Sequence, residues 1–550
     1  MLPQRLRFAL AIFFGPLLII SQMTSVQAEP AVGRCLTIFS QPVSGEEAIS
    51  ALGANDGYVA SLNSLTLAEL NSLLIQNPTF HLDICGNGFY ADSMMVPGRS
   101  AMPAIGAFLP STLPTSSAVK ANARAADYNS VFKLHSNPGS SKTIYLDFDG
   151  ERIENTAWNK NFNAGAPWTA PGFSQDADFA NFSHSELEVI QSVWQRVAED
   201  YAPFDIDVTT ENPPTGSLER TNAADQIYGT RALISNDTVI FNSCTCSGLA
   251  YVGAFDSIGN LHDVNQPAWI FTQGLGDNPK YLAEAVTHEV GHTLGLSHDG
   301  TNSISYYPGQ NGWAPIMGVG FYQPVTQWSK GDYLQASNNE DDLAVVRSHG
   351  VELRADEDDN SEKSARALAQ NQSLGGVISS ASDKDYFSFT SAVTSEFIVE
   401  ASTATLSPNL DVTVMIYRTG NQATALSFNT PLVISSTDIA DGLSVRFSQT
   451  LQAGTKYIVV VDGGGVSTPS IPYSSYGSIG TYKIGITKGG AAQLAPVVTQ
   501  AAVSDNTLPS KLVLPSQTNT SPLALELPSL RKKLLWLESK ILSWRFSIPE

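Results

Sequence analysis

The chain has 550 residues, of which 42% are hydrophobic and 9% aromatic, values typical of a globular protein rather than a disordered one. This length is too great for one ordinary hydrophobic core and predicts about two to four domains. With 31 Lys and Arg against 52 Asp and Glu, the formal net charge is −21. Such an acidic balance argues against nucleic acid, or an anionic membrane, as the main partner.

The chain begins with features of a signal peptide. Arg5 and Arg7 precede an apolar run at 8–20, and Ala28 is the small residue that a signal peptidase accepts. The apolar run is too short to span a bilayer comfortably, so we expect cleavage after residue 28 and secretion, with a periplasm as one possible point of transit. No later stretch reaches about 18 consecutive apolar residues, so we expect the mature protein to be soluble.

Residues 29–127 form the next predicted region, which resembles a propeptide. It ends in a Ser-, Thr-, Pro- and Ala-rich stretch at 110–126 that indicates a linker or processing region. In an exported protein disulfides are the default. The economical pairing joins the two cysteines of this region to each other and the two later ones to each other. The four candidates are Cys35, Cys85, Cys244 and Cys246. A Cys-x-Cys metal clip is the alternative for the later pair.

Residues 128–350 hold most of the motif-like content and predict an α+β or α/β domain, with a mixed sheet and a few long helices. The expected elements are a strand at 143–148, a helix from a capping box at 183–186 to about 201, strands at 204–210, 239–241 and 248–255, a helix from 281 to about 294, and a late helix at about 340–348. Trp194 recurs with apolar residues at helical spacing, so we expect it in the core.

A metal-binding pattern lies within the helix predicted from residue 281. Residues 287–299 read Thr-His-Glu-Val-Gly-His-Thr-Leu-Gly-Leu-Ser-His-Asp. His288 and His292 project from one helix face about a turn apart, which suits two tetrahedral Zn²⁺ ligands. The glycine three residues after His292 lets the chain leave the helix, so that His298 can return as a third ligand. Three protein ligands leave a fourth position for water, the arrangement of catalytic zinc sites, and Glu289 can reach that water as a general base.

This pattern, HExxHxxGxxH, resembles the signature of the metzincin zinc endopeptidases. Metzincins carry a Met-containing turn beneath the metal, and the Ala-Pro-Ile-Met-Gly run resembles it, which gives Met317 that supporting role. Asp299 and the run at 248–253 look more like the adamalysin branch than the matrixins. The resemblance implies that 248–255 is an edge strand to which a peptide substrate adds antiparallel.

The pattern departs from the astacin and serralysin branches at one position. Those branches place a tyrosine two residues after the methionine, where this chain has Val319. Tyr322 is then the candidate for transition-state support.

A wider resemblance covers much of the chain. The stretches YLDFDG (145–150), RVAEDYAPFDIDVTT (196–210), HEVGHTLGLSHDG (288–300), WAPIMGVGFY (313–322) and QWSKGDY (327–333) are similar to a family of secreted bacterial metzincin-like proteases. The stretches DKDYFSF (383–389), NLDVTVMIY (409–417) and AGTKYIVVVDG (453–463) resemble the bacterial pre-peptidase C-terminal domain.

Residues 354–488 consist of short alternating runs separated by Gly, Ser and Asn, which predict an all-β sandwich. The acidic run at 356–360 offers clustered oxygen ligands, so Ca²⁺ is a second candidate ion, with a solvated acidic linker as the alternative. Residues 489–550 predict a linker and a short basic amphipathic helix. We expect that helix to be a small docking helix, with contact to a membrane surface as the alternative.

Together these features predict a secreted zinc metalloendopeptidase that hydrolyses peptide bonds of proteins or peptides through a zinc-bound water activated by Glu289. We expect a zymogen, a monomer, no nucleic-acid partner and no membrane contact. Two alternatives remain open. The chain could be a cell-surface or adhesin-type binding protein with a vestigial zinc site, and Cys85 could occupy the zinc as a cysteine switch. A third motif, Asp147–Gly150, resembles that of haloacid-dehalogenase phosphatases, but Glu151 replaces the expected threonine.

Overall fold

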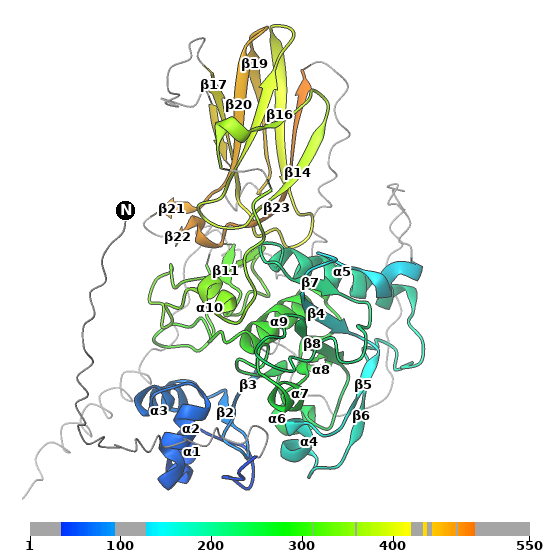
Figure 1. Ribbon diagram of the computed structural model, residues 1–550, viewed down its shortest axis with the longest axis vertical. Coiled ribbons are helices and arrows are strands. Elements are labelled where there is room, and N and C mark those ends of the chain that lie inside the picture. The colour runs from blue at the N-terminus through cyan, green and yellow to red at the C-terminus, as the bar shows by residue number, and fades with distance from the viewer. Residues whose placement is uncertain are drawn as a thin grey trace, which may run out of the picture. The chain divides into compact units, whose positions relative to one another are not determined.

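The computed structural model describes residues 35–93, 128–310, 312–357, 360–419, 433–436, 443–468 and 471–489. The predicted signal peptide, the linker at 110–126 and the amphipathic C-terminal helix lie outside these residues. Figure 1 shows the described part, with its helices and strands labelled where there is room. None of these helices is long and apolar enough to cross a membrane.

The region up to residue 350 is built around a mixed sheet of eight strands. In spatial order its strands are β1 (Val43–Ser44), β2 (Phe80–Leu82), β3 (Gly88–Asp92), β9 (Gly248–Tyr251), β10 (Ala268–Phe271), β8 (Tyr228–Ser235), β4 (Lys142–Asp147) and β7 (Asp207–Thr209). Strands β10, β8, β4 and β7 are parallel to their neighbours in this group. Every residue of β10 is buried, as in strands covered on both faces.

The N-terminal region extends this sheet. Strand β9 pairs antiparallel with β10, and β3 pairs antiparallel with the other edge of β9. Strands β2 and β1 follow outward, each antiparallel to its neighbour. The region also holds α1 (Gly45–Leu52), α2 (Asp56–Leu62) and α3 (Leu67–Gln76). Strand β9, which the resemblance predicts at the edge of the sheet, is therefore paired on both sides in this structure.

Two long helices pack against each other beside the sheet, α5 (His184–Asp200) and α9 (Pro279–Thr293). Helix α5 begins at the predicted capping box, in which Ser183 and Glu186 bond reciprocally through side chain and backbone. Shorter elements of this region are α4 (Ala157–Phe162), α6 (Phe241–Cys244), α7 (Asn260–Val264), α8 (Thr272–Leu275), α10 (Asp342–Ser348), β5 (Gly150–Ile153), β6 (Trp168–Pro171), β11 (Trp313–Pro315) and β12 (Val325–Gln327).

The strand expected at 239–241 is wrong. The carboxylate of Asp237 accepts a hydrogen bond from the backbone N–H of Ile240, which starts a turn that leads into α6. The strand expected at 248–255 ends at Tyr251, before Gly253 with its positive φ of 66°. Trp194 is only partly buried, and its indole N–H donates to the carbonyl of Val208.

Residues beyond 360 form two facing β-sheets, as the alternating pattern predicts. One sheet has the order β13 (Arg366–Ala367), β15 (Lys384–Thr390), β20 (Lys456–Gly463), β17 (Val412–Arg418) and β18 (Val433–Ser436). The other has the order β14 (Ser373–Ile378), β23 (Gly480–Lys488), β16 (Ser395–Thr403) and β19 (Val445–Leu451). Strand β21 (Val466–Thr468) pairs antiparallel with β22 (Ile471–Tyr473).

The β-rich part contacts the end of α5 through buried polar groups. The side-chain amide of Asn409 donates to Asp200 at 3.0 Å. Glu199 accepts from both the backbone N–H and the hydroxyl of Thr481, at 2.9 and 2.6 Å. Because Asp200 also holds α9, these bonds connect the β-rich part to the helix that carries the metal-binding pattern.

Candidate metal centre and active site

Helix α9 is a buried element held by the helix beside it. Asn278 caps its start by accepting from the backbone N–H groups of Lys280 and Tyr281. Midway, the hydroxyl of Thr287 donates to Asp200 at 2.7 Å, and the Tyr201 hydroxyl donates to the Thr287 carbonyl at 3.1 Å. All residues from Leu282 to Thr293 are buried. These contacts fix the rotation of α9 about its axis.

The chain leaves α9 at Gly295, which has a φ of +88°. A Cβ at this position would lie 2.4 Å from Nε2 of His349, so a glycine is required by both conformation and space. The turn that follows brings His298 back toward the helix, as the sequence pattern predicts.

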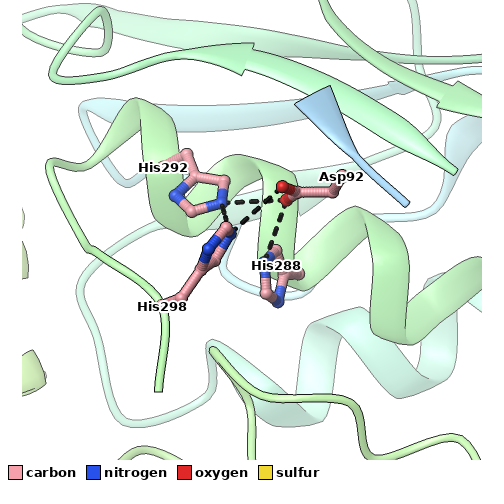
Figure 2. Close-up of side chains that lie close together, drawn as sticks. All are labelled: Asp92, His288, His292 and His298. Atoms are coloured by element: carbon pink, nitrogen blue, oxygen red, sulfur yellow. Dashed lines mark hydrogen bonds and ion pairs between the residues drawn. The ribbon is translucent and has the colours of Figure 1, made fainter. Parts of the chain in front are cut away.

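The three histidines of the pattern converge on one point with a fourth group, the carboxylate of Asp92 (Figure 2). Nε2 of His292 lies 3.0 Å from Nε2 of His298. The Asp92 carboxylate lies 3.1 Å from Nε2 of His288, 3.0 Å from that of His292 and 3.1 Å from that of His298. All four side chains are buried.

Backbone carbonyls orient two of these imidazole rings. Nδ1 of His288 lies 3.0 Å from the carbonyl oxygen of Ile316, and Nδ1 of His292 lies 2.7 Å from that of Leu296. A carbonyl acceptor at Nδ1 leaves the Nε2 lone pair free to bind a metal. Burial lowers the pKa of His292, and that of His298 to about 4, which favours the neutral imidazole that metal binding requires.

Glu289 lies beside this cluster with an exposed fraction of 0%. Neither of its carboxylate oxygens has a hydrogen-bond partner among the described residues. Burial, and then the nearby Asp92 carboxylate, raise the pKa of Glu289 well above its usual value. The side chain packs against β9, because a Cβ on Gly248 would lie only 2.1 Å from Oε1 of Glu289.

The donor set fits a zinc ion. Three imidazole nitrogens about 2.0–2.1 Å from one tetrahedral Zn²⁺ would lie about 3.3 Å apart, close to the 3.0 Å between Nε2 of His292 and Nε2 of His298. An orphaned buried carboxylate at Glu289 is otherwise costly, and a metal with its water would give it a partner. The geometry therefore suits zinc held by His288, His292 and His298.

Met317 and Asp299, which the sequence comparison with metzincins singles out, contact each other through their backbones. Met317 is fully buried under α9, where its sulfur would lie 2.7 Å from a Cβ on Gly291. Asp299 is buried, donates its backbone N–H to the Met317 carbonyl and accepts from the Tyr333 hydroxyl at 3.3 Å. Burial raises the pKa of Asp299 to about 7. Met317 therefore packs against α9 at Gly291, and Asp299 bonds to the backbone of Met317.

Tyr322 does not join the cluster. It is 56% exposed, its ring contacts Tyr281 in the first turn of α9, and no contact recorded in the described part links it to the histidines. Tyr306, which the sequence patterns did not single out, lies there instead. Its hydroxyl donates to Oδ1 of Asp92 at 2.8 Å, and its ring centroid lies 4.4 Å from that of His298.

Asp92 is the second residue of the site that the sequence patterns do not single out. No motif surrounds it, and only strand pairing between β3 and β9 brings it to the metal site from about 200 residues away. The preference of histidine clusters for a fourth ligand could have prompted a search for an acid in the N-terminal region, but nothing in the sequence selects this one.

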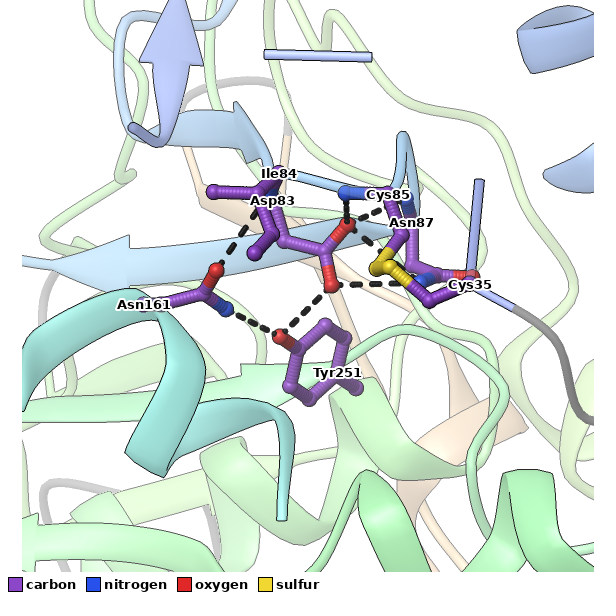
Figure 3. The surroundings of a disulfide bond; sticks show 7 residues. All are labelled: Cys35, Asp83, Ile84, Cys85, Asn87, Asn161 and Tyr251. Atoms are coloured by element: carbon purple, nitrogen blue, oxygen red, sulfur yellow. Dashed lines mark hydrogen bonds between the residues drawn. A yellow bond between two sulfur atoms is a disulfide. The ribbon is translucent and has the colours of Figure 1, made fainter. Parts of the chain in front are cut away.

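The cysteines pair as the economical scheme predicts, Cys35 with Cys85 and Cys244 with Cys246. The cysteine-switch alternative is therefore wrong for this structure, because the Cys85 sulfur is bonded to Cys35. The metal-clip alternative fails for the same reason. Figure 3 shows that the first disulfide closes a turn beside the buried carboxylate of Asp83.

A second acidic cluster lies in the β-rich part, formed by Asp356, Asp383 and Asp385. Asp383 is only 3% exposed, and its Oδ1 has no hydrogen-bond partner among the described residues. The phosphatase-like Asp147 ends strand β4, and its carboxylate accepts from the backbone N–H groups of Asp149 and Gly150 in the turn that follows.

Comparison with known proteins supports the metallopeptidase character of one region. Residues 190–299 match the model of the Metallo-peptidase family M12B Reprolysin-like. This segment contains the later part of α5, the parallel strands β7, β8 and β10, and the three histidines. No curated protein matches the chain.

Two solved structures are similar to parts of the chain. One is the pre-Peptidase C-terminal Domain of Collagenase from Bacillus anthracis, with 13% identity and a TM-score of 0.17, over 23% of this chain and 99% of that one. The other is Aeromonas hydrophila PliG, a periplasmic inhibitor of g-type lysozyme, with 10% identity and a TM-score of 0.16, over 22% of this chain and 95% of that one. TM-scores this low carry no argument. At 190–299 this chain thus has a region similar to the reprolysin-like metallopeptidases, which are metalloproteases.

Proposed function

We propose that this protein is a secreted, zinc-dependent endopeptidase of the metzincin type that hydrolyses peptide bonds of protein substrates. The observation that carries this proposal is the buried Glu289 carboxylate, without a hydrogen-bond partner, next to three converging Nε2 atoms. A structural zinc site has no use for an adjacent unpaired carboxylate, whereas a hydrolytic site needs a base there. The same feature counts against the adhesin alternative with a vestigial site.

His288, His292 and His298 would hold the ion, and zinc so bound lowers the pKa of water and polarises a carbonyl group. A peptide substrate would add antiparallel along β9, and this pairing would place one of its carbonyl groups beside the histidines. Glu289 would take the proton of the attacking water with its carboxylate and then deliver it to the departing amine nitrogen.

We assign transition-state support to the hydroxyl of Tyr306 rather than to that of Tyr322. The Tyr306 hydroxyl already donates to a carboxylate oxygen that lies 3.1 Å from Nε2 of His298. A donor aimed at this position can stabilise negative charge that develops on a substrate oxygen there.

The test is cleavage of denatured casein by the purified, zinc-loaded mature protein, from which the propeptide-like region at 29–127 has been removed, beside a Glu289→Gln variant. The glutamine keeps the size of the side chain but cannot take a proton, so we expect activity to fall by about 10²–10⁴ with one zinc still bound. Glu188→Gln, on the exposed face of α5, is the matched control and should keep full activity. A Glu289→Gln protein as active as wild type would reject Glu289 as the base, and an inactive wild type would favour the adhesin alternative.

A further inference from the structure

We propose that Asp92 is the fourth zinc ligand of a latent form, and that β3 blocks the substrate strand β9 while Asp92 blocks the metal. The inference rests on the proposed zinc peptidase function and adds its regulation. It goes beyond a propeptide in general, because it names the carboxylate and the strand that inhibit.

The first observation is that β3 occupies the edge to which a substrate is expected to add. Phe89, Tyr90, Ala91 and Asp92 pair with Tyr251, Ala250, Leu249 and Gly248 in antiparallel register. This is the direction that the metzincin resemblance implies for a peptide substrate on β9. While β3 is paired, the backbone groups on this edge of β9 are not available to another chain.

The second observation explains how a strand in the substrate position can escape cleavage. The carbonyl oxygen of Asp92 accepts from the backbone N–H and the hydroxyl of Ser247, each at 2.6 Å. The carbonyl is therefore turned toward β9, and it is the side-chain carboxylate that faces the histidines (Figure 2). No peptide carbonyl of this residue is offered for attack, and the carboxylate fills the place of a water.

Further contacts of the N-terminal region with the histidines support a built inhibitory site. The ring of Tyr90 lies 4.2 Å from that of His292 and 4.3 Å from that of His298, centroid to centroid. The side-chain amide of Asn77 lies 3.2 Å from Nδ1 of His298. Inhibition therefore involves three residues of one segment, all of which would leave the site together.

A disulfide-closed turn anchors this segment to the β9 side of the protein (Figure 3). Asp83, next to the Cys35–Cys85 bond, accepts from the Tyr251 hydroxyl at 3.0 Å. The same hydroxyl accepts from the side-chain amide of Asn161 at 2.8 Å. Since Tyr251 belongs to β9, the hydrogen bond that anchors the N-terminal region and the β3 pairing that blocks the substrate edge involve the same strand.

The experiment compares the full-length wild-type chain with Asp92→Ala and Asp92→Asn chains, each loaded with one zinc ion. Acetohydroxamate, a small bidentate zinc ligand, is titrated into each by calorimetry, and the visible spectrum is recorded after substitution of cobalt for zinc. We expect weak or no hydroxamate binding by wild type and binding tighter by about tenfold or more in Asp92→Ala, with a changed cobalt spectrum. The asparagine variant keeps the shape of Asp92 and serves if the alanine variant does not fold.

Asp56→Asn, an acid of α2 that makes no contact with the histidines, is the matched control and should behave as wild type. Equal hydroxamate affinity and identical cobalt spectra for wild type and both Asp92 variants would overturn the proposal, as would failure of every chain to hold zinc. An Asp92→Ala chain that binds zinc and hydroxamate more tightly but cleaves no protein supports the proposal for Asp92. It does not count against the proposed peptidase function, because β3 still occupies the edge of β9 in that full-length chain.

Discussion

Replacement of Gly248 by alanine should disable Glu289 without removing a metal ligand. The new methyl carbon would lie 2.1 Å from Oε1, 2.5 Å from Cδ and 2.6 Å from Cγ of Glu289. These separations are far below van der Waals contact, and Glu289 is fully buried, so its whole side chain must move. We expect the unfolding free energy to fall by about 1–3 kcal/mol from overpacking.

The effect on catalysis should exceed the effect on stability. A displaced general base loses about 10²–10⁴ in rate, while the three histidines still hold zinc. Wild-type and Gly248→Ala proteins, secreted and processed alike, would be compared for casein cleavage, zinc content and urea unfolding. Gly375→Ala in β14 is the control, because the nearest atom to its new Cβ, the carbonyl oxygen of Tyr482, lies 3.5 Å away, an ordinary contact. It should keep full activity and gain about 0.5–1 kcal/mol. A Gly248→Ala enzyme with wild-type activity would refute the packing of Glu289 against β9.

Burial raises the pKa of Glu199 from 4.5 to about 7, so the folded protein keeps a proton that the unfolded chain loses between these values. Stability should therefore fall as pH rises from about 4.5 to about 7, and Glu199→Gln should flatten that slope in urea unfolding at a series of pH values. Ca²⁺ at 100 times its Kd should stabilise the β-rich part by about 2.7 kcal/mol in thermal scans, and Asp383→Asn should remove the gain if that cluster binds the ion. Tyr306→Phe should lower kcat with little change in KM, whereas Tyr322→Phe should change neither, and the reverse result would restore Tyr322 to its predicted role.

The local parts of the fold follow from the sequence because their causes are local. A capping box starts α5, and a glycine with positive φ lets the chain leave α9. Alternation of apolar and polar residues marks the strands beyond residue 360. The three histidines meet because helical spacing and one turn bring them together. By contrast, the strand expected at 239–241 is wrong. The Asp237 carboxylate accepts from the backbone N–H of Ile240 and so stabilises a turn, which the pattern of apolar residues does not reveal.

The missed residues of the site have long-range causes. Asp92 and Tyr306 reach the histidines only through the pairing of β3 with β9 and through a loop without regular structure. Neither has a motif around it, since one carboxylate or one hydroxyl can serve from any backbone that arrives in place. Tyr322 is the sequence-based candidate because Val319 stands where related branches have a tyrosine, but the structure leaves Tyr322 exposed.

The most direct test of this account is a crystal structure of the full-length protein with anomalous data collected at the zinc edge. The account predicts one zinc peak bound by Nε2 of His288, His292 and His298 and by a carboxylate oxygen of Asp92, with Glu289 beside it. Zinc on the same three histidines with water as the fourth ligand, and Asp92 turned away, would contradict the proposed latent form. No zinc among the histidines would contradict the metallopeptidase assignment itself.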